Sequence, residues 1–285
     1  MGYGSYSVTN RSVRSSALGY ETKNITDIFV NRQLDNGMNP KNVEIRESRD
    51  SEEHPNSVPI ILGLDVTGSM GRIPHALVKD GLPKIMGRII ENGVNDPQVL
   101  FLGIGDDKYD SAPLQIGQFE SNDELLDKWL TSLYLEGGGG GNGGESYSLA
   151  WYFAALKTAT DSFEKRNEKG FIFTIGDEPV HRELTVASIN KFIGGEERTY
   201  YASELLAMAQ EKYHVFHIHI AHGVRSFNEV VINGWKELMG DNLIITNNSK
   251  DIPTIISETI TNTIGSKNDV ASFNTYQSTE EEVIL

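Results

Sequence analysis

From Val58 onward, short apolar runs alternate with longer segments in which apolar residues recur at helical spacing. This alternation restricts the possible folds more than any other feature of the sequence. The first run, VPIILGLD, has no polar side chain before its final aspartate, as is typical of a strand buried on both faces. The pattern predicts strands at residues 58–65, 98–104, 114–119, 170–175, 213–221 and 242–246, and helices at 73–90, 123–135, 145–163, 203–211, 227–239 and 252–264. We therefore expect an α/β fold in which helices cover both faces of a mostly parallel central sheet.

The regular pattern divides the chain into three segments. Residues 1–56 show no sustained period and are expected to form an N-terminal arm, either extended or docked on the domain. Residues 57–265 are expected to form one large domain. Residues 266–285 are polar, end in an acidic stretch that includes Glu280, and are expected to form a mobile tail.

Composition excludes several classes of function. The 285 residues include no cysteine, so disulfides, thiol chemistry and zinc–cysteine sites are absent. The net charge of -15 opposes binding to nucleic acid or to an anionic membrane surface. No apolar run approaches the roughly 20 residues that cross a bilayer, and the N-terminal residues lack a secretion-type apolar stretch. We expect a cytoplasmic protein that binds neither nucleic acid nor membrane.

The loop after the first predicted strand carries three oxygen-bearing side chains, Asp65, Thr67 and Ser69. In a parallel α/β sheet, ligands bind beyond the carboxyl ends of the strands. Gly68 allows a sharp turn that would let the three side chains converge. With no nearby Cys or His, this set suits Mg²⁺, Mn²⁺ or Ca²⁺. The alternative is that Thr67 or Ser69 only caps the following helix.

Two further loops are rich in groups that suit a metal ion. Residues 137–144 are almost entirely glycine, and Asn142 and Glu145 supply oxygens where the next helix is expected to begin. This stretch lacks the Lys-Ser/Thr of a phosphate-binding P-loop, so it is either a flexible linker or a place where backbone approaches an ion closely. Asp177 ends the strand predicted at 170–175.

Together these loops resemble the von Willebrand factor A (vWA) family and its metal-ion-dependent adhesion site (MIDAS). Asp65, Thr67 and Ser69 match the family's Asp-x-Ser/Thr-x-Ser, and Asp177 matches its later aspartate. The glycine loop departs from the common Gly-Gly-Thr form: Glu145 falls where the threonine usually lies. The resemblance, over residues 58 to about 250, implies a Rossmann-like fold and a six-coordinate ion with one open position. It leaves open whether Glu145 binds the ion directly or through water; Asn142 would lie in its outer shell.

The resemblance implies a non-catalytic function. A MIDAS-bound cation, Mg²⁺ or else Mn²⁺ or Ca²⁺, takes a carboxylate from a partner protein as its last ligand. The expected partner is therefore a protein that supplies an Asp or Glu. Within the family, such partners include AAA+ ATPases and multi-subunit assemblies.

Two other functions remain possible from the sequence. A haloacid dehalogenase-like phosphohydrolase would use Asp65 as nucleophile with magnesium, but it needs an acid two residues later, where this chain has Thr67. A structural subunit would use the metal only to stabilise loops. Asp106, Asp107 and Asp110 are expected to be loop acids near the metal face that could hold a second ion such as calcium.

Three histidines follow or lie within the strand predicted at 213–221, namely His217, His219 and His222. The first two share one face of the strand and could bind a transition metal. Their neighbours are mostly apolar, which favours buried core histidines instead.

Overall fold

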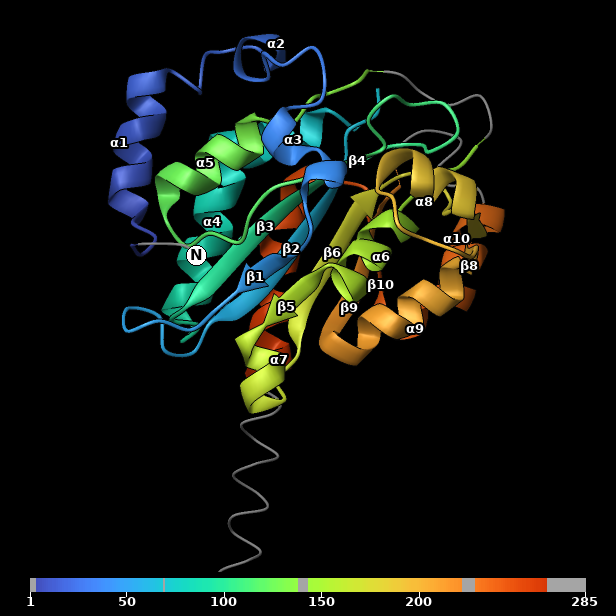
Figure 1. Cartoon of the computed structure of the whole chain (residues 1–285). Coiled ribbons are helices and arrows are strands. Elements are labelled where there is room, and N and C mark those ends of the chain that lie inside the picture. Colours follow the sequence, from blue (N-terminus) through green and yellow to red (C-terminus); the bar gives the residue numbers. More distant parts are fainter. Residues whose placement is uncertain (1–3, 69, 138–142, 222–228, 266–285) are drawn as a thin grey trace, which may run out of the picture.

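The computed structural model describes residues 4–68, 70–137, 143–221 and 229–265. Its centre is a six-stranded sheet of strand order β10-β9-β6-β2-β3-β4 (Figure 1). Every neighbouring pair is parallel except β3 and β4, which run antiparallel. The strands are β2 (Val58–Asp65), β3 (Pro97–Ile104), β4 (Leu114–Ile116), β6 (Gly170–Gly176), β9 (Tyr213–Ile220) and β10 (Leu243–Thr246). The expected Rossmann-like α/β architecture is confirmed.

Both faces of this sheet are covered, which explains why the strand sequences are apolar throughout. In β2, Ile60 and Leu62 belong to one hydrophobic core, whereas Ile61 belongs to the other. The first core is completed by α3 (Arg72–Ala76), the π-helical turn η3 (Leu77–Gly81), α4 (Leu82–Glu91), α5 (Asp123–Thr131) and the closing helix 252–265. The second is completed by α6 (Ser148–Leu156), α8 (Val186–Phe192), α9 (Ala202–Lys212) and α10 (Glu229–Met239).

The helix expected at 145–163 is interrupted. Helix α6 begins at Ser148 and ends at Leu156. The short strand β5 (Thr158–Thr160) follows it, and the chain becomes helical again in α7 (Asp161–Arg166). Strand β5 pairs in parallel with β1 (Arg46–Ser48). The two β-branched threonines suit a strand, and pairing with a distant segment outweighs the helical spacing.

The arm is docked over its described part. It contains α1 (Val8–Leu18), α2 (Ile25–Ile28), the 3₁₀ turns η1 (Asn36–Met38) and η2 (Pro40–Asn42), and β1. Helix α1 packs against α4 and α5 (Figure 1), where the buried Arg11 forms an ion pair of 2.6 Å with Asp127. Apolar residues of the arm, including Phe29 and Met38, extend the first core.

The remaining elements are peripheral. They are β7 (Glu183–Leu184), β8 (Tyr200–Tyr201), η4 (Gly240–Asn242) and η5 (Ser249–Asp251). None of the helices in the described ranges combines the length and apolar content that crossing a bilayer requires. The tail predicted at 266–285 lies outside the described residues.

Candidate metal centre

Three loops that carry aspartates begin at the same edge of the sheet. Strand β2 ends at Asp65, β3 is followed by Asp106, and β6 is followed by Asp177. The three strands are adjacent and parallel, so their carboxyl ends lie together. The backbone N–H of Val66 donates to the carbonyl of Ile104 at 3.0 Å, which ties the first two loops to each other.

Asp65 is fully buried and accepts three hydrogen bonds from residues in the described part of the chain. Its Oδ1 accepts from the backbone N–H of Thr67 at 2.9 Å and from the Thr67 hydroxyl at 2.6 Å. Its Oδ2 accepts from the phenol of Tyr147 at 2.9 Å. Burial raises the pKa of Asp65 to about 7 despite these bonds, and the neighbouring charge of Asp177 adds to the rise.

Glu145 is a buried carboxylate among other carboxylates. Its backbone N–H donates to Pro179 at 2.9 Å, its carbonyl accepts from His181 at 3.1 Å, and its side chain is 3% exposed. Among the described residues its Oε2 has no hydrogen-bond partner. Burial first, then the charges of Asp65 and Asp106, raise the pKa of Glu145 to about 10. Buried negative charge of this kind calls for a proton or a cation, so this donor set fits a divalent ion.

The structure brings together four of the residues that the sequence predicted to lie at the ion, namely Asp65, Thr67, Glu145 and Asp177. Tyr147 lies among them: burial, followed by the charges of Asp65, Glu145 and Asp177, raises the pKa of its phenol well above the ordinary value. Thr67 joins the group through its bonds to Asp65. Ser69 and Asn142, also nominated, lie outside the described residues.

The sequence analysis did not predict Tyr147 at this site, although one residue, Gly176, indicates that a side chain approaches the end of β6. Gly176, immediately before Asp177, leaves the space that the phenol occupies: a Cβ built on it would lie 1.9 Å from Tyr147 Oη and 2.9 Å from Asp65 Oδ2. A residue without a side chain at the end of a buried strand marks a close approach of this kind.

We expect Gly176→Ala to lower the free energy of unfolding by about 1–3 kcal/mol, because the added methyl group must displace Tyr147 or Asp65. Urea unfolding measures the change. Gly234→Ala in α10 is the matched control: its Cβ meets nothing within 4 Å, and alanine should stabilise the helix by up to about 1 kcal/mol. Equal stability of Gly176→Ala and wild type would contradict the close approach of Tyr147 and Asp65 to Gly176.

The strand histidines belong to the core, as the sequence favoured. His217 is buried, its Nδ1 lies 2.9 Å from the hydroxyl of Thr174, and its ring stacks on Trp235 with centroids 3.5 Å apart. Burial lowers the pKa of His217 well below its usual value, so the ring is neutral. His219 is also buried, and His222 lies outside the described residues.

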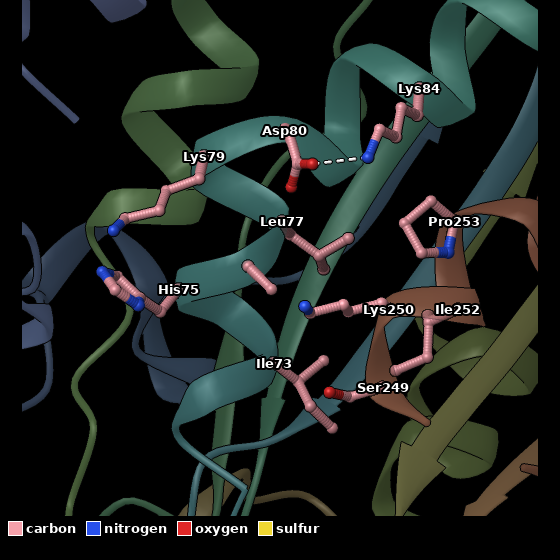
Figure 2. Close-up of a pocket in the computed structure, with 11 residues that line it drawn as sticks. Ile73, His75, Leu77, Lys79, Asp80, Lys84, Ser249, Lys250, Ile252 and Pro253 are labelled. Atoms are coloured by element: carbon pink, nitrogen blue, oxygen red, sulfur yellow. Dashed lines mark hydrogen bonds and ion pairs between the residues drawn. The ribbon is translucent and has the colours of Figure 1, made fainter. Parts of the chain in front are cut away.

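A cavity of about 450 Å³ is separate from this centre (Figure 2). It lies between the η3 region and the start of the closing helix, with apolar walls that include Leu77 and Ile252. Lys84 and Asp80 form an ion pair at its rim (Figure 2). Among the described residues, none of those that the sequence predicted to bind an ion lines this cavity.

Comparisons with known proteins add no functional argument. No protein-family model and no curated protein matches the chain. Among solved structures, the pilus adhesin SpaC from Lactobacillus rhamnosus GG, in its open conformation, is similar with a TM-score of 0.49 and 12% identity, over 75% of this chain and 30% of that chain. Proximal thread matrix protein 1 from the mussel byssus is similar with a TM-score of 0.45 and 13% identity, over 72% of this chain and 47% of that chain. The chain thus spans less than half of either protein.

Proposed function

We propose that this chain is a vWA-type domain that holds one divalent cation, Mg²⁺ in the first instance, at a MIDAS-like site and uses it to bind a carboxylate on a protein partner. The residues assigned to the ion are Asp65, Thr67, Ser69 and Asp177, with Glu145 beside it. When bound, the ion supplies an open coordination position. The domain itself performs no catalysis.

The observation that carries the proposal is the state of Glu145. Its carboxylate is buried next to Asp65, and one oxygen has no hydrogen-bond partner within the described part of the chain. The charged form of a buried carboxyl group without a partner is costly, and a divalent cation bound at this centre would stabilise that form.

The residue types favour binding over hydrolysis. Thr67 stands two residues after Asp65, where a phosphohydrolase of the haloacid dehalogenase type needs a proton donor, and its hydroxyl donates to Asp65 instead. A hydroxyl ligand adds no negative charge, so the ion keeps its attraction for an outside carboxylate. With a net charge of -15, the protein surface as a whole does not attract an acidic partner, and a local cation would have to do so.

We expect partner capture to require both the ion and Asp65. The immobilised 285-residue chain should capture its partner in Mg²⁺. The amount captured should fall at least about tenfold in EDTA or in Asp65→Ala, because the carboxylate of the partner would bind through the ion. Thr67→Val, which removes one hydroxyl and keeps the shape, should also weaken capture. The matched control is Asp241→Asn, on the exposed turn η4, which should capture as wild type does.

The two rival functions give different results in the same experiments. A structural role predicts that Mg²⁺ raises the melting temperature while EDTA leaves partner capture unchanged. A phosphohydrolase predicts magnesium-dependent turnover of phosphoesters that disappears in Asp65→Asn. Either result would overturn the proposal.

A further inference from the structure

A second group of potential metal ligands lies beside the candidate centre. Asp106, Asp107 and His181 each offer one ligand atom, and these atoms lie within 4.8 Å of one another. The two acids follow β3, whereas His181 comes from the loop after β6. All three are nearly buried, with exposures of 0%, 5% and 9%.

The sequence predicted Asp110, and not His181, as the third ligand of this group. Asp110 was expected to join the two preceding acids, but its Oδ2 accepts from the backbone N–H of Asp106 at 2.7 Å and so closes its own loop. His181 takes its place: its Nε2 lies 2.9 Å from Asp106 Oδ1. The backbone bond from His181 to Glu145 holds the imidazole at this edge of the sheet.

An unsatisfied oxygen points independently to a ligand. Asp106 is completely buried, and its Oδ1 accepts from the backbone N–H of Lys108 at 3.0 Å. Its Oδ2 is buried and has no hydrogen-bond partner among the described residues. Buried carboxylate oxygens are normally paired, so this one is an open acceptor inside the group.

The carboxylate of Asp107 is held in place by two serines. The hydroxyl of Ser146 donates to its Oδ1 at 2.6 Å, and the hydroxyl of Ser188 in α8 donates to its Oδ2. The backbone N–H of Asp107 donates back to Ser146 at 2.9 Å. Outer hydrogen bonds of this kind orient the carboxylates of metal sites, because each oxygen keeps a lone pair for the ion.

We infer that Asp106, Asp107 and His181 bind a second divalent cation, of the Mn²⁺ or Zn²⁺ class, next to the MIDAS-like site. Two carboxylates and one imidazole suit these ions, whereas calcium takes oxygen ligands almost only. The site is independent of the proposed function, since it does not include Asp65.

Lys108 determines where the proton of His181 lies when no ion is bound. Its Nζ lies 3.2 Å from Nδ1 of His181 and can only donate, so the imidazole proton is on Nε2 and faces Asp106. On binding, the cation takes the position of that proton, the proton moves to Nδ1, and the exposed ammonium turns to solvent. Because Lys108 must leave Nδ1 for this to happen, Lys108 competes with the ion.

Pulsed electron paramagnetic resonance on the full-length protein titrated with Mn²⁺ tests the inference, because it detects the ¹⁴N nucleus of a bound imidazole. Wild type and Asp65→Ala should both show nitrogen coupling. His181→Gln should lose it and bind this ion at least about tenfold more weakly, because loss of a direct ligand costs no less than loss of an outer partner, whereas the control His75→Gln should keep it. Lys108→Gln should tighten binding severalfold, and excess Zn²⁺ should remove the coupled signal.

Asp106→Asn guards against misfolding of the histidine variant, because it keeps a hydrogen-bonding group and removes one charge. It should weaken the coupled ion at least tenfold while circular dichroism stays unchanged. Absence of nitrogen coupling in wild type at saturating Mn²⁺ would overturn the inference, and so would coupling that persists in His181→Gln. Loss of coupling in Asp65→Ala would show that there is one site rather than two.

Discussion

The affinity of this protein for Mg²⁺ should rise about tenfold with each pH unit between pH 7 and pH 9. The pKa of Glu145 is raised to about 10, so this carboxyl carries a proton throughout that range when no ion is bound. A cation bound at this centre would displace the proton of Glu145, and the release of one proton per ion corresponds to a tenfold change per pH unit. Below pH 7 the dependence should steepen, since Asp65, with a pKa of about 7, must then also lose a proton.

Isothermal titration calorimetry at pH 7, 8 and 9 measures this dependence. Repeating each titration in two buffers of different ionisation enthalpy counts the released protons directly. Glu145→Gln is the matched variant, because it retains the size of the side chain and has no proton to release. It should flatten the slope above pH 7. A slope that remains tenfold per unit in Glu145→Gln would show that another group supplies the proton.

The main sheet could be predicted because its strands are buried on both faces. Residues 58–64 and 99–104 have no polar side chain for that reason, and the ends of these runs fix where the ligand loops lie. Strand β5 could not be predicted in this way. Its conformation depends on pairing with β1 from the arm, and no local pattern records a partner so far away in the sequence.

The candidate site divides along the same line. Asp65 ends β2, Thr67 lies two residues beyond it and Asp177 directly follows β6, so predicting the strands also predicted that these residues lie close together. Tyr147 and His181 reach this neighbourhood from outside the strands. The phenol fills the space left by Gly176, and the imidazole is positioned by a backbone hydrogen bond from His181 to Glu145. Such placements depend on tertiary packing, which a single sequence does not encode in a periodic form.

Arg11→Ala should lower the free energy of unfolding by about 3–5 kcal/mol, which is a large effect for a residue of the N-terminal arm. The Arg11 side chain is fully buried, forms an ion pair of 2.6 Å with Asp127 in α5, and donates to the carbonyl of Val78. Asp127 is itself 6% exposed, and after the substitution the Tyr20 phenol, at 2.7 Å, is the one side-chain donor to its carboxylate among the described residues. The cost arises mainly from leaving that carboxylate buried without its cation.

Urea unfolding with paired controls separates this cost from loss of helix packing. Arg14→Ala removes a neighbouring arginine whose ion pairs with Asp123 and Glu124, at 3.4 and 3.3 Å, are partly exposed, so it should cost at most about 1 kcal/mol. The double variant Arg11→Met with Asp127→Leu removes both charges and should recover most of the lost stability, because no charge is then left unpaired. If Arg11→Ala costs no more than Arg14→Ala, the arm is not anchored through this pair. If Arg11→Ala is much less stable than wild type while the double variant is nearly as stable as wild type, apolar packing holds α1 against α4 and α5. The charge of Arg11 then serves to neutralise the buried Asp127.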